Sequence, residues 1–327
     1  LPDPELLENN INYTQPQGIQ VVDISDPTNP ILVNEWDGVV QSHNIMEEDG
    51  FLYVVGSFSP FSVDGTEQSW GLDDLIILDL NDPANPNKVG GWSGVYIHDV
   101  CIFDDVLYGC GIETHDMWAI DISDKSNPQV ITSWDGIPSA HACWVSDDGN
   151  TLFTASETSG GHIMSWDVAD LENINLLDEW MPPNGEAWSA HNIFIKNDRL
   201  YISYYVYGLQ ILDVSDPLNM YRLGYFDSLD EIGLNLNTND IYSSAWGTYP
   251  YFNSEQIIIS DMSRGLFIVE DYDMTGDLNN DDIVDIIDVI TIVNIILDDS
   301  YDTSADINQN GIVDIVDIIG IINIILD

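Results

Sequence analysis

Residues 18–30 read GIQVVDISDPTNP, and this stretch decides the fold. A short run rich in β-branched residues ends at Asp23, and the DPTNP link that follows carries Asp, Pro and Asn, which favour turns. A second extended run, ILVNEW, continues over residues 31–36. Two short extended runs separated by turn residues predict a β-hairpin.

This hairpin recurs along the chain. Its first strand ends in an acidic residue in every copy, with a Glu in the degenerate last one: Asp23, Asp79, Asp121, Asp167, Asp213 and Glu270. Its second strand ends in an aromatic residue in the first five copies: Trp36, Trp92, Trp134, Trp180 and Phe226. Between these hairpins lies another one, whose first strand begins with a histidine in four copies: His43, His98, His141 and His191.

Alternating hairpins of these two kinds give four short strands per repeat, which is typical of a β-propeller blade. We therefore predict an all-β propeller over residues 1–272, with about six four-stranded blades. Five blades are complete in the sequence, whereas residues 18–38 supply only half a blade. Either residues 1–17 complete a sixth blade, or the chain is a fragment of a larger ring. The recurring tryptophans are expected in the blade core.

The order and spacing of these motifs resemble the LVIVD-repeat proteins, in particular the extracellular group called choice-of-anchor B proteins. The VVDISDP-like strands, the His-led strands and the closing stretch SAWGTYPYFNSEQIIISDMSRGLFIVE (residues 244–270) carry the resemblance. It implies a propeller fold. The family has no settled activity that the resemblance could transfer.

Residues 273–327 carry a different pattern in two copies, 29 residues apart. The copies read DLNNDDIVDIID from Asp277 and DINQNGIVDIVD from Asp306, each followed by an Ile-rich stretch. Side-chain oxygens at positions one, three, five, nine and twelve, with the carbonyl at position seven, match a calcium loop. The candidate ligands are Asp277, Asn279, Asp281, Ile283, Asp285 and Asp288 in the first loop, and Asp306, Asn308, Asn310, Ile312, Asp314 and Asp317 in the second.

These loops have Asp rather than Glu at position twelve and no preceding helix, and in both respects they resemble type I dockerin modules. The resemblance covers residues 277–326 and implies a small α domain with two Ca²⁺ ions and a protein partner, usually a cohesin. Positions ten and eleven, which contact the partner, are aliphatic here: Ile286, Ile287, Ile315 and Val316. That favours an internal or homotypic hydrophobic contact over ordinary cohesin binding.

Both predicted helices are apolar on nearly all sides, and such a helix must be covered. One face can pack on the other helix of the pair. The rest of their apolar surface must be covered by the propeller, by a cohesin-like receptor or by another copy of the chain.

The four histidines are expected at the inner strands of the propeller, where they could ring the central channel. Converging imidazoles are good ligands for a transition metal. Alternatively, each ring hydrogen-bonds the backbone of a neighbouring blade and locks the ring of blades. Cys101 and Cys110 either face each other across a hairpin or remain free thiols, and Cys143 is the third cysteine.

Acidic residues dominate the composition: 57 Asp and Glu face six Lys and Arg, for a formal charge of −51. Nucleic acids and anionic membranes recruit proteins through Lys and Arg, so neither is an expected partner. The charge favours a salt-rich or calcium-rich setting outside the cell. No apolar run reaches the length of a membrane span. No signal peptide is visible, and because the sequence opens at Leu1 without a Met, we expect a mature or trimmed chain.

No nucleophile elbow, phosphate-binding loop or zinc-protease motif is present in the sequence. We therefore expect a non-enzymatic, secreted scaffold or adhesion protein at the cell surface, which assembles, and self-assembles, through its calcium module. One alternative is a binding propeller docked to a cohesin-like partner. The other is a carbohydrate-active hydrolase with an appended dockerin.

Overall fold

The computed structural model describes residues 18–39, 41–59, 69–70, 74–183, 185–228, 242–252, 256–270, 276–279, 283–298, 300–307 and 311–326. The chain divides into two compact units, residues 1–268 and 269–327, and each is described by itself. Among the described residues the only α-helices are α2 (Ile286–Leu297) and α3 (Ile315–Leu326). Two short 3₁₀ turns are η1 (Gly185–Ala187) and η3 (Thr303–Ala305).

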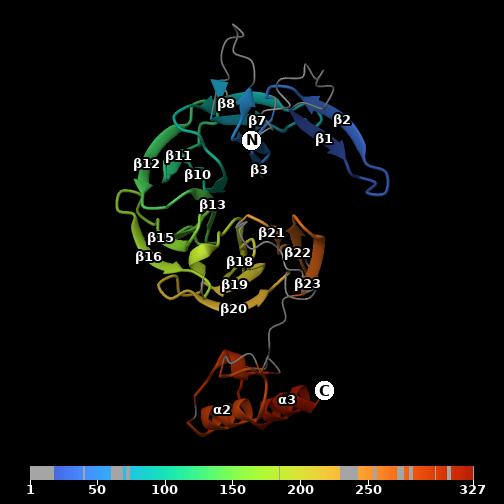
Figure 1. Ribbon diagram of the computed structural model, residues 1–327, viewed down its shortest axis with the longest axis vertical. Coiled ribbons are helices and arrows are strands. Elements are labelled where there is room, and N and C mark those ends of the chain that lie inside the picture. The colour runs from blue at the N-terminus through green and yellow to red at the C-terminus, as the bar shows by residue number, and fades with distance from the viewer. Residues whose placement is uncertain are drawn as a thin grey trace. The chain divides into compact units, whose positions relative to one another are not determined.

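The first unit is built from antiparallel sheets that follow one another in chain order around a common centre (Figure 1). Four of these sheets have four strands and one has three. The first blade contains β3 (Asn44–Glu48), β4 (Phe51–Val55), β7 (Leu75–Asp79) and β8 (Asn87–Trp92). The second contains β9 (Val100–Phe103), β10 (Val106–Gly111), β11 (Asp116–Asp121) and β12 (Gln129–Asp135).

The remaining blades repeat the same antiparallel order. The third contains β13 (Ala140–Val145), β14 (Thr151–Ser156), β15 (Ile163–Asp167) and β16 (Asn175–Trp180). The fourth contains β17 (Ile193–Lys196), β18 (Arg199–Ser203), β19 (Leu209–Asp213) and β20 (Tyr221–Phe226). The fifth has β21 (Ala245–Tyr249), β22 (Gln256–Asp261) and β23 (Gly265–Glu270). The predicted all-β propeller with four-stranded blades is confirmed.

Two smaller sheets accompany the blades. β1 (Ile19–Asp23) and β2 (Ile31–Trp36) form the hairpin predicted from GIQVVDISDPTNP, and β5 (Phe58–Ser59) pairs with β6 (Ser69–Trp70). The β1–β2 hairpin packs on the first blade through a small apolar core: Ile19, Val39, Leu52, Val54, Ile76 and Leu78.

The described residues thus form five blades and a half-blade, and the expectation of about six four-stranded blades is corrected to five. The repeat at residues 18–38 supplies only the two outer strands of a blade. Residues 1–17, the proposed source of its inner strands, lie outside the described residues.

The repeated acidic residues shape the hairpin turns. Asp23 accepts a hydrogen bond from the backbone N–H of Ser25 at 2.8 Å, and Asp26 accepts one from Thr28 at 3.0 Å. The same bonds recur in the other hairpins, with acceptors Asp79, Asp82, Asp121, Asp124, Asp167, Asp170, Asp213 and Asp216. The bond from Ser25 lowers the pKa of Asp23, and bonds from the hydroxyl and the backbone N–H of Thr28 lower that of Asp26. Part of the acidic composition therefore stabilises turns, because the Asp side chain accepts hydrogen bonds from the turn backbone.

The apolar cores lie between neighbouring blades. Met117 and Ala119 of the second blade share one buried cluster with Leu152 and Trp166 of the third. The tryptophans that end the fourth strands are half-buried and pack against such clusters, as predicted for core residues: Trp36, Trp92, Trp134 and Trp180. Face-to-face packing explains why β14 is buried along its whole length.

The second unit is a duplicated loop–helix element. Ile292 of α2 and Ile321 of α3 are both fully buried, and Ala305 belongs to the same buried core. The partly buried residues around them fall into equivalent pairs from the two copies: Leu278 and Ile307, Val284 and Val313, Val289 and Ile318. The sequence duplication is therefore also a structural one. No helix within the described ranges is long and apolar enough to cross a bilayer.

Candidate functional site

The four repeated histidines lie in a continuous row at the inner strands of the propeller. The ring centroids of His43 and His98 are 3.7 Å apart, those of His98 and His141 are 4.5 Å apart, and those of His141 and His191 are 4.2 Å apart. The fifth copy of the motif has lost the histidine and places Trp246 there, 5.0 Å from His191. The structure thus brings together all four residues that the repeats singled out.

The repeat itself explains this convergence. The backbone N–H of His98 donates to the carbonyl of Cys110 at 2.8 Å, and that of His191 donates to Ser203 at 2.9 Å. His43 is held in the same way by the carbonyl of Val55, at 3.1 Å. Each bond ties the histidine to the end of the second strand of its own blade, so the side chains leave equivalent points of successive blades.

Burial keeps three of the imidazoles uncharged. His141 and His191 are only 2% and 3% exposed, and His98 is nearly as buried, whereas His43 is exposed. Burial lowers the pKa of His98 and of His191 to about 3, and that of His141 well below its usual range. Each of these rings is therefore neutral at neutral pH and offers a nitrogen lone pair.

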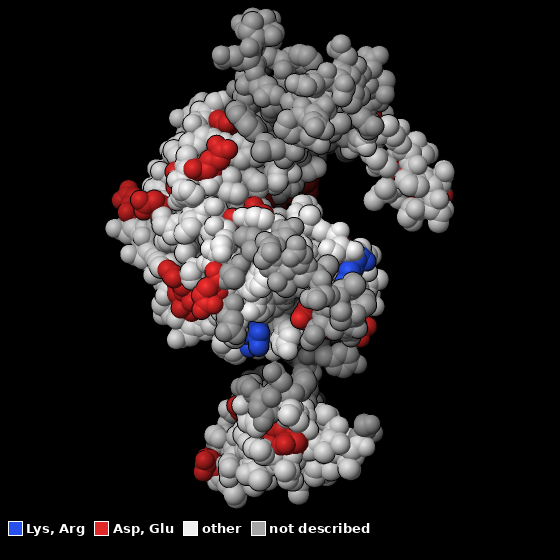
Figure 2. Space-filling model, in the orientation of Figure 1, with Lys and Arg blue, Asp and Glu red and all other residues white. Residues whose placement is uncertain are grey.

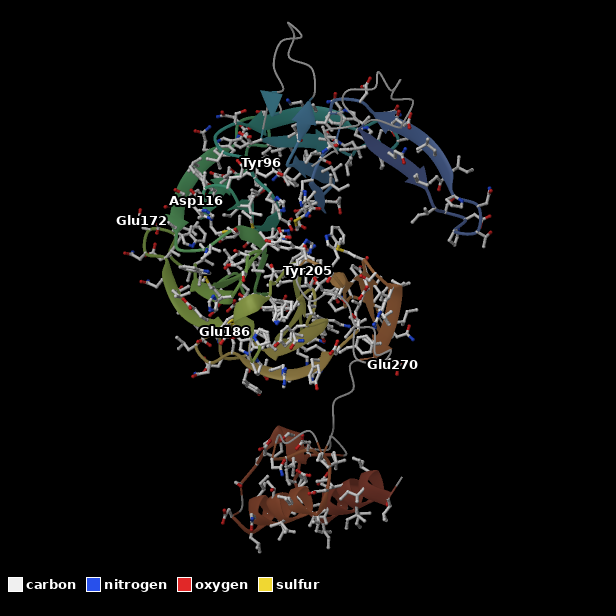
Figure 3. The ribbon with its side chains drawn as sticks, viewed as in Figure 1. Tyr96, Asp116, Glu172, Glu186, Tyr205 and Glu270 are labelled. Carbon is white, nitrogen blue, oxygen red and sulfur yellow. The ribbon has the colours of Figure 1, made fainter. Side chains whose placement is uncertain are left out.

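Glu157 adds a carboxylate to the row. Its Oε2 lies 3.6 Å from Nε2 of His141, and its Oε1 lies 4.0 Å from Nε2 of His191. The phenol of Tyr205, labelled near the centre of the first unit in Figure 3, donates a hydrogen bond to Oε1 at 2.6 Å. Burial raises the pKa of Glu157, and the Tyr205 hydrogen bond opposes that shift. No repeat marks Glu157 or Tyr205, so neither residue could be singled out from the sequence.

These side chains form two groups with the donors of a metal site. One potential ligand atom each from His43, His98 and His141 lies within 4.8 Å of the others, and the same holds for His141, Glu157 and His191. Three buried ring nitrogens have no hydrogen-bond partner: His98 Nε2, His141 Nδ1 and His191 Nδ1. The alternative role, a hydrogen bond from each ring to a neighbouring blade, is supported for two of the rings. A hydrogen bond to the backbone of His191 partly offsets the lowering of the His141 pKa by burial, and one to the backbone of Trp246 does the same for His191.

A cavity of about 320 Å³ adjoins the row. Its lining includes the residues that directly follow the four histidines: Asn44, Asp99, Ala142 and Asn192. Asp99 accepts hydrogen bonds through Oδ1 from the Asn44 amide and from the N–H of Val100. Burial raises the pKa of Asp99 to about 7. The His-led motif could have indicated these four lining residues, because each follows a repeated histidine by one position in the sequence.

The three cysteines are free and buried in the second and third blades. Cys101 lies opposite Tyr108 in the β9–β10 pairing, so Cys110 is diagonal to it, and the free-thiol alternative describes the pair. The Sγ atom of Cys143 lies 3.0 Å from that of Cys101. Burial raises the pKa of the Cys101 and Cys110 thiols, which keeps them protonated.

In the first predicted calcium loop, the carboxylate at position twelve ties the loop to its helix. Oδ1 of Asp288 accepts hydrogen bonds from the N–H groups of Leu278 and Asn279 at 2.7 and 3.2 Å, and its Oδ2 accepts one from Asp285 at 2.8 Å. Asp285 in turn caps the helix by accepting from Ile287 at 2.7 Å. Asp277 and Ile283 are also described, whereas Asp281 lies outside the described residues.

The second loop repeats this arrangement. Oδ2 of Asp317 accepts from the N–H of Asp314 at 2.9 Å, and Oδ2 of Asp306 accepts from Gly311 at 2.7 Å. Ile312 is described here as well, whereas Asn308 and Asn310 lie outside the described residues. Asp288 and Asp317 are fully buried, and Asp306 nearly so. Residues 269–327 contain no Lys or Arg to balance these carboxylates. The donors described for them are backbone N–H groups and, for Asp306, the phenol of Tyr301 at 3.3 Å.

Comparison with known proteins identifies the repeats. Residues 14–37, 112–135 and 187–227 match the family described as LVIVD repeat. The class of protein is therefore a β-propeller that carries LVIVD repeats, as the resemblance in the sequence implied. No curated protein matches the chain.

Solved structures share the fold of the first unit. A functionally unknown protein from Desulfotomaculum acetoxidans is 13% identical, with a TM-score of 0.58 over 78% of this chain and 76% of its own. A putative 6-phosphogluconolactonase from Bacteroides uniformis is 12% identical, with a TM-score of 0.53 over 81% and 91%. Another, from Bacteroides fragilis, is 11% identical, with a TM-score of 0.51 over 80% and 88%. At these identities the similarity is one of fold alone.

Proposed function

We propose that the protein is a non-enzymatic extracellular scaffold whose C-terminal, dockerin-like unit binds two Ca²⁺ ions and then joins copies of the chain. One observation carries this proposal. Asp288 and Asp317 are fully buried carboxylates in a unit without a single Lys or Arg, and the helices that begin beside them expose aliphatic side chains.

The buried carboxylates support a divalent cation. Burying a charge costs free energy unless it is paired or coordinates a metal. Carboxylate and amide oxygens at the spacing of these loops are the donors that Ca²⁺ takes. In such a module the ligands repel one another until the cation binds, so that metal affinity becomes folding free energy.

The exposed helix surfaces support assembly. The aliphatic residues exposed at equivalent positions of α2 and α3 are Ile286 and Ile315, Ile287 and Val316, Ile290 and Ile319, and Leu297 and Leu326. We call these eight residues the aliphatic face. Exposed apolar patches of this kind mark interaction sites.

We assign the aliphatic face to a second copy of the chain. Its two halves carry the same uncharged chemistry through the internal duplication, so each half can contact a different copy, and such contacts continue into a polymer. Figure 2 shows acidic side chains scattered over the visible faces of both units and few basic ones. Copies therefore repel each other at long range, and calcium reduces that repulsion as it binds.

Sedimentation velocity and electron microscopy of the full chain test the proposal. In calcium we expect concentration-dependent polymers that dissociate when a chelator is added. The double variant Ile290→Glu/Ile319→Glu should stay monomeric and still bind calcium, because it changes the aliphatic face and spares the loops. Leu218→Glu, which changes an exposed leucine of the propeller, is the matched control and should polymerise normally.

Three other outcomes would contradict self-assembly. A chain that stays monomeric in calcium at high concentration overturns it. If that monomer binds a purified cohesin, the docked-propeller alternative replaces it. Turnover on a panel of polysaccharides would instead establish a hydrolase.

A further inference from the structure

We propose that His141, Glu157 and His191 hold one divalent transition-metal ion at the axis of the propeller, in a site separate from the calcium loops. Two imidazoles and one carboxylate form a donor set that proteins use for Zn²⁺ and for non-haem Fe²⁺. Nitrogen donors of this kind do not suit Ca²⁺, which takes oxygen ligands.

The distances between the donors fit a shared ion better than direct contacts. The separations of 3.6 and 4.0 Å between the Glu157 oxygens and the two Nε2 atoms are too long for hydrogen bonds. Two donors on one tetrahedral Zn²⁺, each at about 2.0–2.1 Å, lie about 3.3–3.4 Å apart. A bound ion would therefore shorten these two separations by about 0.2–0.7 Å.

The Nε2 atoms of His141 and His191 face the Glu157 carboxylate in an interior where both rings are almost completely buried. The Nδ1 atoms, on the other side of each ring, are the ones without a hydrogen-bond partner among the described residues. An ion bound through the two Nε2 atoms would offset the cost of burying the Glu157 carboxylate.

The surroundings provide what a metal site needs. Tyr205 donates its hydrogen bond to Oε1 of Glu157 and so fixes the carboxylate, as groups around a metal ligand commonly do. Three protein ligands leave at least one coordination position open. The next ring in the row, His98, lies 4.5 Å from His141.

The overlapping group His43, His98 and His141 is the weaker choice. It shares His141 with the proposed site, so the same lone pair cannot serve both ions. It also includes the exposed His43 and has no carboxylate to balance a dication. We therefore assign the ion to the buried group.

Cobalt titration of the full chain, purified without a histidine tag and stripped of metal, tests the site. Saturating Ca²⁺ is kept present throughout. We expect one Co²⁺ per chain, visible d–d absorption bands, and displacement of Co²⁺ by Zn²⁺. Glu157→Gln should weaken Co²⁺ binding more than tenfold and change the bands, and Tyr205→Phe should weaken it roughly tenfold.

Two controls keep the result decisive. His162→Asn removes a histidine outside the row and should leave the titration unchanged. Asp288→Ala/Asp317→Ala alters the calcium loops and should also leave the Co²⁺ bands intact. Absence of bands in the folded wild-type chain overturns the proposal, and so do bands that persist unchanged in Glu157→Gln. Loss of the bands in the calcium-loop variant would assign them to the second unit and overturn it equally.

Discussion

At the residue scale, Asp99 shows how the propeller axis uses polar groups. It follows His98 directly and lies buried beside the cavity, where burial raises its pKa to about 7. Both of its hydrogen bonds reach the same oxygen, Oδ1. When Asp99 is protonated, the proton is therefore expected on its other oxygen, Oδ2.

The raised pKa predicts that ionising Asp99 destabilises the fold. The unfolded chain loses this proton near pH 3.8, whereas the folded chain keeps it until about pH 7. Between these values the folded state binds the extra proton, so its stability falls as the pH rises and is lowest above pH 7. Asp99→Asn keeps an oxygen for both hydrogen bonds and cannot ionise.

We therefore expect the unfolding free energy of Asp99→Asn, relative to the wild type, to rise between pH 4 and pH 8. The rise should approach about 4 kcal/mol, which is the free energy equivalent of the difference between the pKa values in the folded and unfolded chain. Denaturant unfolding at several pH values measures it. A difference that stays constant across this range would show that Asp99 titrates normally in the folded protein.

At the element scale, the two helices and the strands are stabilised by apolar cores of different size. The blades stack in series and share cores with their neighbours, whereas α2 and α3 depend on one small core around Ile292 and Ile321. Small cores of this kind give little stability by themselves. Calcium is expected to supply the remainder.

Two substitutions in α3 separate packing from assembly. Ile321→Ala opens the core and should cost about 2–4 kcal/mol, enough to lower the helical circular dichroism of the second unit in calcium. Ile319→Ala, two residues away on the aliphatic face, should leave the unfolding transition within about 0.5 kcal/mol. Equal losses from both would mean that the two side chains are buried alike.

Much of the fold follows from periodicity. The hairpins, their Asp-based turns and the half-buried tryptophans follow directly from GIQVVDISDPTNP and its copies. The row of histidines follows as well, because equivalent residues of successive blades meet at the axis. Glu157 and Tyr205 could not be found in this way, since each occurs once and reaches the row only through tertiary packing. The five blades and the half-blade also follow from the repeats, but half a repeat does not specify which strands would complete it, and the expectation of about six blades therefore failed.

At the scale of the whole molecule, a strongly acidic propeller is joined to a small unit that we propose to depend on calcium. The formal charge of −51 opposes association of copies, while the aliphatic face of the second unit favours it. Under the proposed function, calcium would change both the repulsion and the attraction, because its binding would neutralise carboxylates and order the loops. The cation is therefore the expected switch between dispersed and assembled chains.

The central claim is that the two C-terminal loops bind calcium and thereby order their helices. Calorimetric titration of Ca²⁺ into the full-length, chelator-treated chain, followed by circular dichroism, measures this most directly. The account predicts two ions per chain and a gain of helical signal, both strongly reduced in Asp288→Ala/Asp317→Ala. No heat of binding, together with the same helical signal before and after chelation, would contradict it.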